Sequence, residues 1–203
     1  MLKISIKKHL RNILGFSIMF SSFAAKADFF IFEPGIGQKQ ENVKLTTLAL
    51  TESELKLKAL VTTLKMGIRS PSGVSLVLAG EYSKGKAELE PNLTDKPEFN
   101  HLIAGFQVGV QAMGAMKIYL GYAPHNQLEL KNEGTFQGFK LKGNTYQAGL
   151  IFYPFKFLGL GAQYNIHQYK EITGSQFTLG PDVKKYFDKI DSQDLSFLLA
   201  IEI

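Results

Sequence analysis

The sequence of 203 residues contains no cysteine and no tryptophan. Without cysteine, the chain has neither a disulfide framework nor a thiolate metal site. After residue 27 it also lacks an apolar run long enough to cross a bilayer as a helix, which takes about 20 residues. Phenylalanine and tyrosine number 16 and 8, and both residue types favour β-strands. The sequence therefore favours a β-structure that is stabilised by strand pairing.

The first 27 residues have the pattern of a secretory signal peptide. Four basic residues come first, an apolar segment follows at 13–23, and Ala25-Lys26-Ala27 offers small residues at a cleavage site. The basic residues are Lys3, Lys7, Lys8 and Arg11. An apolar run of about 11 residues is too short for a membrane anchor. We expect residues 1–27 to be cleaved and residues 28–203 to form one exported domain.

The positive charge of the chain belongs to this export signal. The whole sequence has 23 Lys and Arg against 18 Asp and Glu. Residues 1–27 hold five of the basic residues and none of the acidic ones, so the remainder has 18 of each. A domain without net charge gives no support for a nucleic-acid partner, which would require a basic patch.

Apolar and other residues alternate along the rest of the chain, as in half-buried strands. Seven segments show this alternation clearly: 60–69, 74–83, 102–110, 116–122, 146–153, 158–167 and 195–203. An eighth is expected at 29–37, although Pro34 lacks the N–H that a central strand donates.

The connections between these segments alternate in length. Those at 70–73, 111–115 and 154–156 are short, whereas those at 38–57, 84–98, 123–144 and 168–193 are long and polar. In an antiparallel meander this places every long loop at one end. The pattern predicts an all-β fold: an eight-stranded antiparallel up-and-down transmembrane β-barrel with short periplasmic turns and long extracellular loops.

Alternation alone does not say which face is outside. A soluble, lipocalin-like barrel would turn the apolar face inward, whereas a membrane barrel turns it toward lipid. Four tyrosines on the apolar face favour lipid, because such residues form a girdle at the level of the lipid headgroups: Tyr82, Tyr122, Tyr146 and Tyr164. The opposite face is rich in glycine, which suits the crowded interior of an eight-stranded barrel.

Two stretches resemble the small outer-membrane barrels of the OmpA/OmpW type. One is the opening Phe29–Gly37, and the other combines Met66-Gly67-Ile68-Arg69 with Ala79-Gly80-Glu81-Tyr82-Ser83. The resemblance implies a bacterial outer-membrane location, contact with outer-membrane lipids including lipopolysaccharide, and insertion by the barrel-assembly machinery. The sequence departs from the family's usual aromatic last residue, since Ile203 stands there.

The inner face carries charges and amides that we expect to form a polar network in the lumen. Its members are Glu33, Lys65, Arg69, Glu81, Gln107, Lys117, Gln147, Gln163 and Glu202. The turn at 70–73 predicts that Lys65 faces Ala79 and that Thr63 faces Glu81. Lys65 then lies one diagonal step from Glu81, within reach of an ion pair. Unpaired charges in so narrow a lumen would be costly, so we favour a plug over a narrow gated pore.

Candidate chemistry is sparse. The sequence shows no paired-carboxylate motif, phosphate-binding loop or His/Asp metal cluster, so no catalytic, cofactor or metal site is predicted. His101 and His167 are expected at polar strand ends, and His125 in a loop. A lipid A deacylase-like enzyme would need a serine near a lipid-facing histidine. No serine stands two positions after His167, and the alternation predicts that His167 faces inward.

The predicted function is therefore a non-enzymatic barrel that presents surface loops. A narrow channel for ions or small apolar solutes is the alternative, and an outer-membrane enzyme is a third. The sequence names no external ligand.

Overall fold

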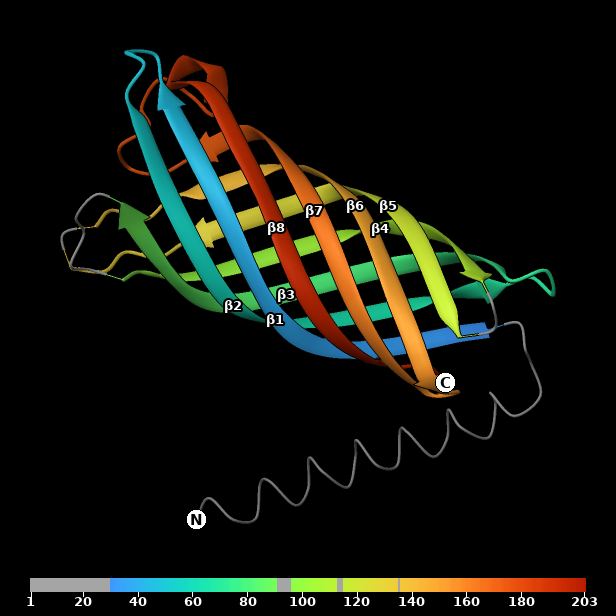
Figure 1. The fold of residues 1–203 in the computed structure, drawn as a ribbon. Coiled ribbons are helices and arrows are strands. Elements are labelled where there is room, and N and C mark those ends of the chain that lie inside the picture. The colour runs from blue at the N-terminus through green and yellow to red at the C-terminus, as the bar shows by residue number, and fades with distance from the viewer. Residues whose placement is uncertain (1–29, 91–95, 113–114, 135) are drawn as a thin grey trace, which may run out of the picture.

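The computed structural model describes residues 30–90, 96–112, 115–134 and 136–203. Eight strands form a closed barrel in which each strand pairs antiparallel with the next and β8 pairs with β1 (Figure 1). They are β1 Phe30–Thr47, β2 Glu52–Arg69, β3 Val74–Glu90, β4 Glu98–Ala112, β5 Met116–Leu130, β6 Lys140–Phe155, β7 Leu158–Thr173 and β8 Phe187–Ile201. The predicted fold class is confirmed. The expected signal peptide lies outside the described residues.

The strands are much longer than predicted, and the long loops are correspondingly shorter. Each strand has 15 to 18 residues, so most of the four expected loops is strand. The connections at that end run only over 48–51, 91–97, 131–139 and 174–186, the last containing the short 3-10 helix η1 Val183–Lys185. His125 accordingly lies in β5, where we had predicted a loop. Among the described residues, no helix has both the length and the hydropathy to cross a bilayer.

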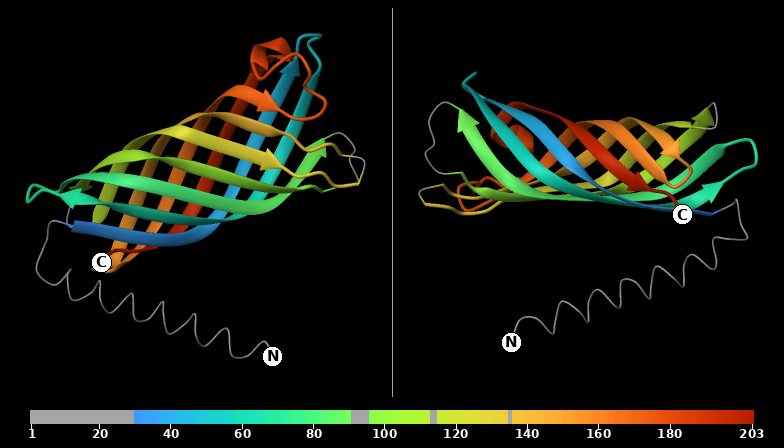
Figure 2. Two further views of the ribbon diagram at one scale, coloured as in Figure 1. Left: turned by 180° about the vertical axis from the view of Figure 1, so that it is seen from behind. Right: turned by 60° about the horizontal axis from the view of Figure 1, so that its bottom comes forward.

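The strand extensions were missed because the polarity of the wall inverts along the barrel axis. The short turns and the C-terminus lie at the same end of the barrel (Figure 2). In the half toward that end, apolar side chains face outward and polar ones face the lumen. In the other half, called here the outer half, the outward positions are polar, for example Lys44 and Lys58, while Val43 and Leu57 are buried inside. A polar outward face resembles a loop when it is read along the sequence.

Strand β5 changes its inward parity at a β-bulge. Its register with β6 shifts between Ala123 and Asn126, and both of these residues are buried inside the barrel. A bulge sets two residues of one strand against one of its neighbour, so the inward positions change from odd to even. This shift turns Asn126 into the lumen.

Pro34 is tolerated in β1 because of its position relative to the backbone pairing with β2 and β8. It lies opposite Leu64 of β2, whereas the regular register with β8 begins only at Gly35. Beyond Pro34, Phe32 and Ile203 exchange two backbone hydrogen bonds. The missing N–H therefore falls between the regular β1–β8 register and this last pair, close to the end of the sheet.

Candidate functional site

The lumen is filled from the turn end by an ion-pair cluster. Register places Glu33 of β1 directly opposite Lys65 of β2. Oε1 of Glu33 lies 3.0 Å from Nζ of Lys65, and its Oε2 lies 2.8 Å from Nζ of Lys117. The hydroxyl of Tyr153 donates a further bond to Oε2 at 2.7 Å. One carboxylate thus pairs with two lysines while all three residues are buried, and Nζ of Lys117 lies 3.8 Å from Oε2 of Glu202 as well.

The expected ion pair between Lys65 and Glu81 is wrong, although the register behind it is confirmed. Thr63 faces Glu81 and Lys65 faces Ala79, as predicted. The lysine instead forms an ion pair with Glu33, directly across the ladder with β1, and its Nζ lies 4.1 Å from the ring centroid of Tyr119. Cross-strand neighbours are closer than diagonal ones, so the β1 partner is preferred.

Amides and a tyrosine fill the next layer. Tyr119 donates to Oε1 of Gln163 at 2.7 Å, and Gln107 donates to Gln147 at 3.1 Å. The Tyr119 ring lies over Gly149, where an added Cβ would stand 2.2 Å from the ring. The structure places all nine predicted network residues in the lumen, with Arg69 and Glu202 half-buried and in contact at the turn end.

A second ion cluster surrounds Lys39, a residue that the sequence analysis had placed in a loop. Its ammonium lies 2.9 Å from Asp194, 3.2 Å from Glu81 and 3.4 Å from Glu41, and the lysine is 3% exposed. Nδ1 of His101 lies 3.0 Å from the same nitrogen. Lys39, Glu41 and Asp194 lie in segments whose polar pattern predicts loops. The alternation of inward and outward positions was therefore not expected there, and the three residues were not predicted to face the lumen.

The two histidines are buried inside the barrel, so their expected place at a polar rim is wrong. Asn126 bridges them, since its Oδ1 lies 2.6 Å from Nε2 of His101 and its Nδ2 3.1 Å from Nδ1 of His167. Nε2 of His167 lies 2.7 Å from Asp194, which also binds Lys39. With both histidines protonated at Nε2, Lys39, His101, Asn126, His167 and Asp194 close a ring of hydrogen bonds. Nδ1 of His101 also lies 2.9 Å from Oε2 of Glu41, and a proton on Nδ1 would be donated to that carboxylate instead.

Glu41, His101 and His167 also bring three possible metal-ligand atoms within 4.8 Å of one another, contrary to the expectation of no such cluster. Two of the three residues also contact the Lys39 ammonium, which lies 3.4 Å from Glu41 and 3.0 Å from His101. The lysine therefore supplies the positive charge that this position favours. The cluster is explained as an internal ion pair without a metal.

Thr145, His167 and Asp194 have the spacing of a nucleophile, a base and an acid. The hydroxyl of Thr145 lies 2.8 Å from Nδ1 of His167, whose Nε2 lies 2.7 Å from Asp194. The three residues are only 0 to 2% exposed. A catalytic nucleophile must meet its substrate, so this burial favours a structural hydrogen-bond chain over an active site.

An apolar core closes the lumen in the outer half. Its buried members come from β1 to β7 and from η1: Val43, Leu45, Leu55, Leu57, Ala87, Phe99, Leu128, Leu130, Leu141, Tyr169, Ile172 and Val183. Phe136, Phe139 and Phe177 of the connecting segments pack against it. Below this core, a cavity of about 10 Å³ lies between Lys65, Glu81 and Gln163. Such a cavity has room for about one water molecule.

The four predicted girdle tyrosines lie on the outer wall, near the middle of their strands. Tyr82, Tyr146 and Tyr164 are 45%, 48% and 41% exposed, and Tyr122 is half-buried with its ring centroid 5.3 Å from that of Tyr146. Tyr82, Tyr122 and Tyr146 were expected at the loop ends of short strands, and Tyr164 about two residues further down its strand. About 26 Å of strand, eight residues of β3, instead follows Tyr82.

Strands β7 and β8 separate in the outer half. Their register ends at the pair His167 and Ser192, although β7 continues to Thr173. A cavity of about 610 Å³ opens there, and its lining includes Lys44, Glu54 and Asp191. This is a polar opening beside the lumen.

Two solved outer-membrane proteins have a similar fold. Ail, the attachment invasion locus protein of Yersinia pestis, superposes with a TM-score of 0.56 at 12% identity, covering 87% of this chain and 100% of Ail. Neisserial surface protein A superposes with a TM-score of 0.53 at 13% identity, covering 84% and 97%. No protein-family model and no curated protein matches the sequence.

The superpositions confirm the fold of small outer-membrane barrels that the OmpA/OmpW resemblance implied. The wall agrees with that fold, because large apolar side chains such as Leu78, Leu120 and Phe197 are 62 to 71% exposed. A bilayer is the environment that covers such a band. Fold and surface together assign the chain to the bacterial outer membrane.

Proposed function

We propose that this chain is a non-enzymatic outer-membrane barrel with a closed lumen, which holds a rigid outer half and its four loops above the membrane. The observation that carries this proposal is the presence of two seals in series. The ion clusters around Glu33 and Lys39 fill the lumen at membrane depth, and the apolar core fills it above.

The two seals differ in physical character. Opening the polar seal would separate buried charges from their partners, and breaking one such pair costs about 3–5 kcal/mol. Opening the apolar seal would expose packed side chains such as Leu57 and Phe99 to water. A solute would have to overcome both, so the resting barrel is expected to be closed.

Planar-bilayer recording of the purified barrel tests the proposal, with heat-modifiable gel mobility as the check of folding. We expect no discrete conductance steps. Leu57→Ser combined with Phe99→Ser should weaken the apolar seal alone and still leave the barrel closed. Regular conductance steps from the unmodified barrel would overturn the proposal.

A narrow channel is the second candidate, and the separation of β7 from β8 favours it. The opening beside His167 and Ser192 could connect the lumen to the outside through the wall. Its polar lining suits ions better than apolar solutes. A disulfide between Gln168→Cys and Asp191→Cys should abolish any current that uses this route and leave a current along the barrel axis unchanged.

The expected partners follow from the membrane location. Outer-membrane lipids, including lipopolysaccharide, would surround the apolar band, and the barrel-assembly machinery would insert the strands. Residues 1–27 would act as the export signal. Blocked cleavage in an Ala25→Arg, Ala27→Arg variant, seen as a larger product, is the expected result.

A further inference from the structure

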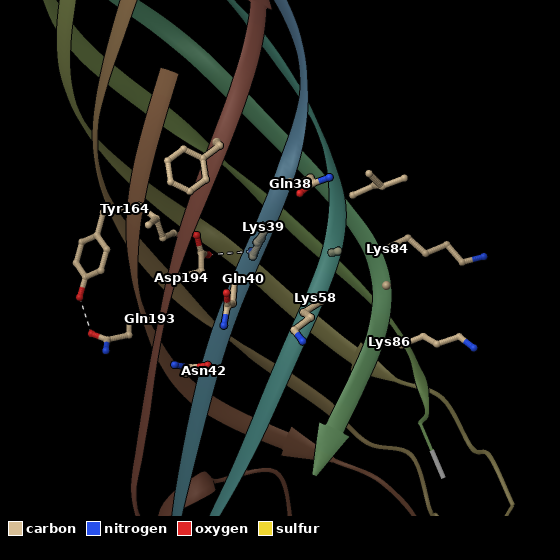
Figure 3. Close-up of a pocket in the computed structure, with 15 residues that line it drawn as sticks. Gln38, Lys39, Gln40, Asn42, Lys58, Lys84, Lys86, Tyr164, Gln193 and Asp194 are labelled. Carbon is tan, nitrogen blue, oxygen red and sulfur yellow. Dashed lines mark hydrogen bonds and ion pairs between the residues drawn. The ribbon is translucent and has the colours of Figure 1, made fainter. Parts of the chain in front are cut away.

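A groove of about 760 Å³ lies on the outer wall, across the boundary between its apolar and polar halves (Figure 3). Strands β1, β2, β3, β7 and β8 contribute to it. Leu60, Leu195 and Phe197 line its apolar part and are 63%, 43% and 62% exposed. Glutamines and lysines, including Gln40 and Lys58, line its polar part. The groove can therefore contact both an apolar part and a polar part of one ligand.

The polar part has an excess of positive charge. Lys58 of β2 lies directly opposite Lys86 of β3, and Lys84 lies one pleat along the same face. All three are exposed on the outward surface, and Figure 3 shows Lys84 and Lys86 extending away from the barrel. Like charges directly opposite on a ladder are destabilising. Strand pairing does not require two lysines at these facing positions. An anionic ligand that binds both of them would explain why they are there.

The nearby carboxylates are shared with other lysines. Glu88 lies 3.8 Å from Lys58 but only 2.8 Å from Lys96. Glu98, which faces Lys86 across the β3–β4 ladder, lies 3.7 Å from Lys84 and 3.2 Å from Lys131. Four lysines therefore share these two carboxylates. Among the described residues, Lys86 forms no ion pair within 4 Å.

The height of the lysines fits the headgroup level of the outer leaflet. Tyr82 precedes Lys84 by one pleat on the same face, and Tyr164, whose hydroxyl bonds Gln193, lies on the far side of the groove. Exposed tyrosines mark the interface between acyl chains and headgroups. The lysines thus begin where the acyl chains end.

We propose that this groove binds one phosphorylated glycolipid of the outer leaflet, of the lipopolysaccharide class. Lys58, Lys84 and Lys86 bind its phosphate groups, and its acyl chains lie along Leu60, Leu195 and Phe197. Basic clusters at a membrane surface recognise anionic headgroups in this way. The inference rests on the proposed membrane setting of the barrel and adds a defined lipid site to it.

Native mass spectrometry of the full folded barrel in detergent tests this site, with purified diphosphorylated lipid A as the probe. We expect one retained lipid per barrel. Lys58→Gln, Lys84→Gln and Lys86→Gln together should weaken retention about 100-fold, from about 1 kcal/mol for each lysine. The matched control changes three exposed lysines outside the groove, Lys44, Lys142 and Lys170, to glutamine and should retain the lipid unchanged.

Further probes separate the two parts of the groove. Dephosphorylated lipid A should bind the unmodified barrel about as weakly as lipid A binds the groove variant. Leu60→Ser with Phe197→Ser should weaken retention of lipid A while the three lysines stay in place. Equal retention by the groove and control variants, or equal binding of both lipids, would overturn the proposal.

Sucrose octasulfate serves as the water-soluble polyanion. Binding of it as tight as that of lipid A, with the same lysine dependence, would replace the lipid site by a general polyanion site. Because the substituted lysines and apolar side chains of the groove are exposed outside the lumen, their replacement should not open the barrel, and these results are separable from those that test the closed lumen.

Discussion

Replacing Lys39 by methionine is the most direct test of the polar seal. The substitution keeps most of the side-chain volume and removes the charge. Three carboxylates surround that charge, those of Glu41, Glu81 and Asp194, at 2.9 to 3.4 Å. Without the ammonium they face one another in a lumen where each is buried.

The expected loss of stability follows from two opposing effects. At an effective dielectric constant of about 20, one pair of unit charges 3 Å apart attracts by about 5 kcal/mol. Burying the charges offsets much of this attraction, but removing one partner leaves the other buried and unpaired. The net cost for such a change is about 3–5 kcal/mol. Adding Asp194→Asn to Lys39→Met should recover part of the loss, because one uncompensated carboxylate is removed.

Urea unfolding of the barrel in detergent measures these differences. The chain has no tryptophan, so far-ultraviolet circular dichroism and heat-modifiable gel mobility follow the transition. Lys170→Met, at an exposed position of β7, makes the same chemical change outside the lumen and should cost under about 0.5 kcal/mol. A cost below about 1 kcal/mol for Lys39→Met, or no recovery in the double variant, would refute the buried ion cluster.

Three further predictions address the wall, the lumen packing and the topology. Leu120→Arg, in the exposed apolar band, should cost about 2–4 kcal/mol or block assembly, as measured by folded yield in membranes. Gly149→Ala forces a Cβ into the Tyr119 ring and should cost about 1–3 kcal/mol in urea unfolding, whereas a neutral result would show that the ring moves freely. A cysteine at Asn132 should react with an impermeant thiol reagent on intact cells, and one at Ser72 should not; the reverse would invert the barrel.

Strand alternation was enough to predict the fold, because period-two patterning and short turns determine a meander. It was also enough for register, as the pairing of Thr63 with Glu81 shows. It could not predict which charges pair. Lys65 has a neighbouring strand on each side. Glu33 lies directly opposite it because β1 and β2 are long strands joined over 48–51, whereas the sequence predicted a loop over 38–57 that leaves their register open.

The second ion cluster could not be predicted from the sequence, for a different reason. Lys39 and Asp194 come from opposite ends of the chain and meet only when β8 pairs with β1. His167 had the correct inward parity, but its partner Asn126 depends on the bulge of β5. A bulge reverses parity without a strong sequence signal, although Pro124 beside His125 marks its place.

The polarity of the outward and inward side chains inverts along the barrel axis. This inversion explains why the loops were predicted to be too long and why the outer half has an apolar core. An outward position is apolar where lipid covers it and polar where water does, while the inward positions take the opposite character. Val43 and Leu57 are therefore core residues of a water-exposed barrel, as in the soluble, lipocalin-like alternative. The apolar face is thus outward in the half that contains the turns, as in a membrane barrel, and inward in the outer half, as in a soluble barrel. The groove at Lys58 and Leu60 lies where one half gives way to the other, and for that reason a ligand with both a charged head and apolar chains fits it best.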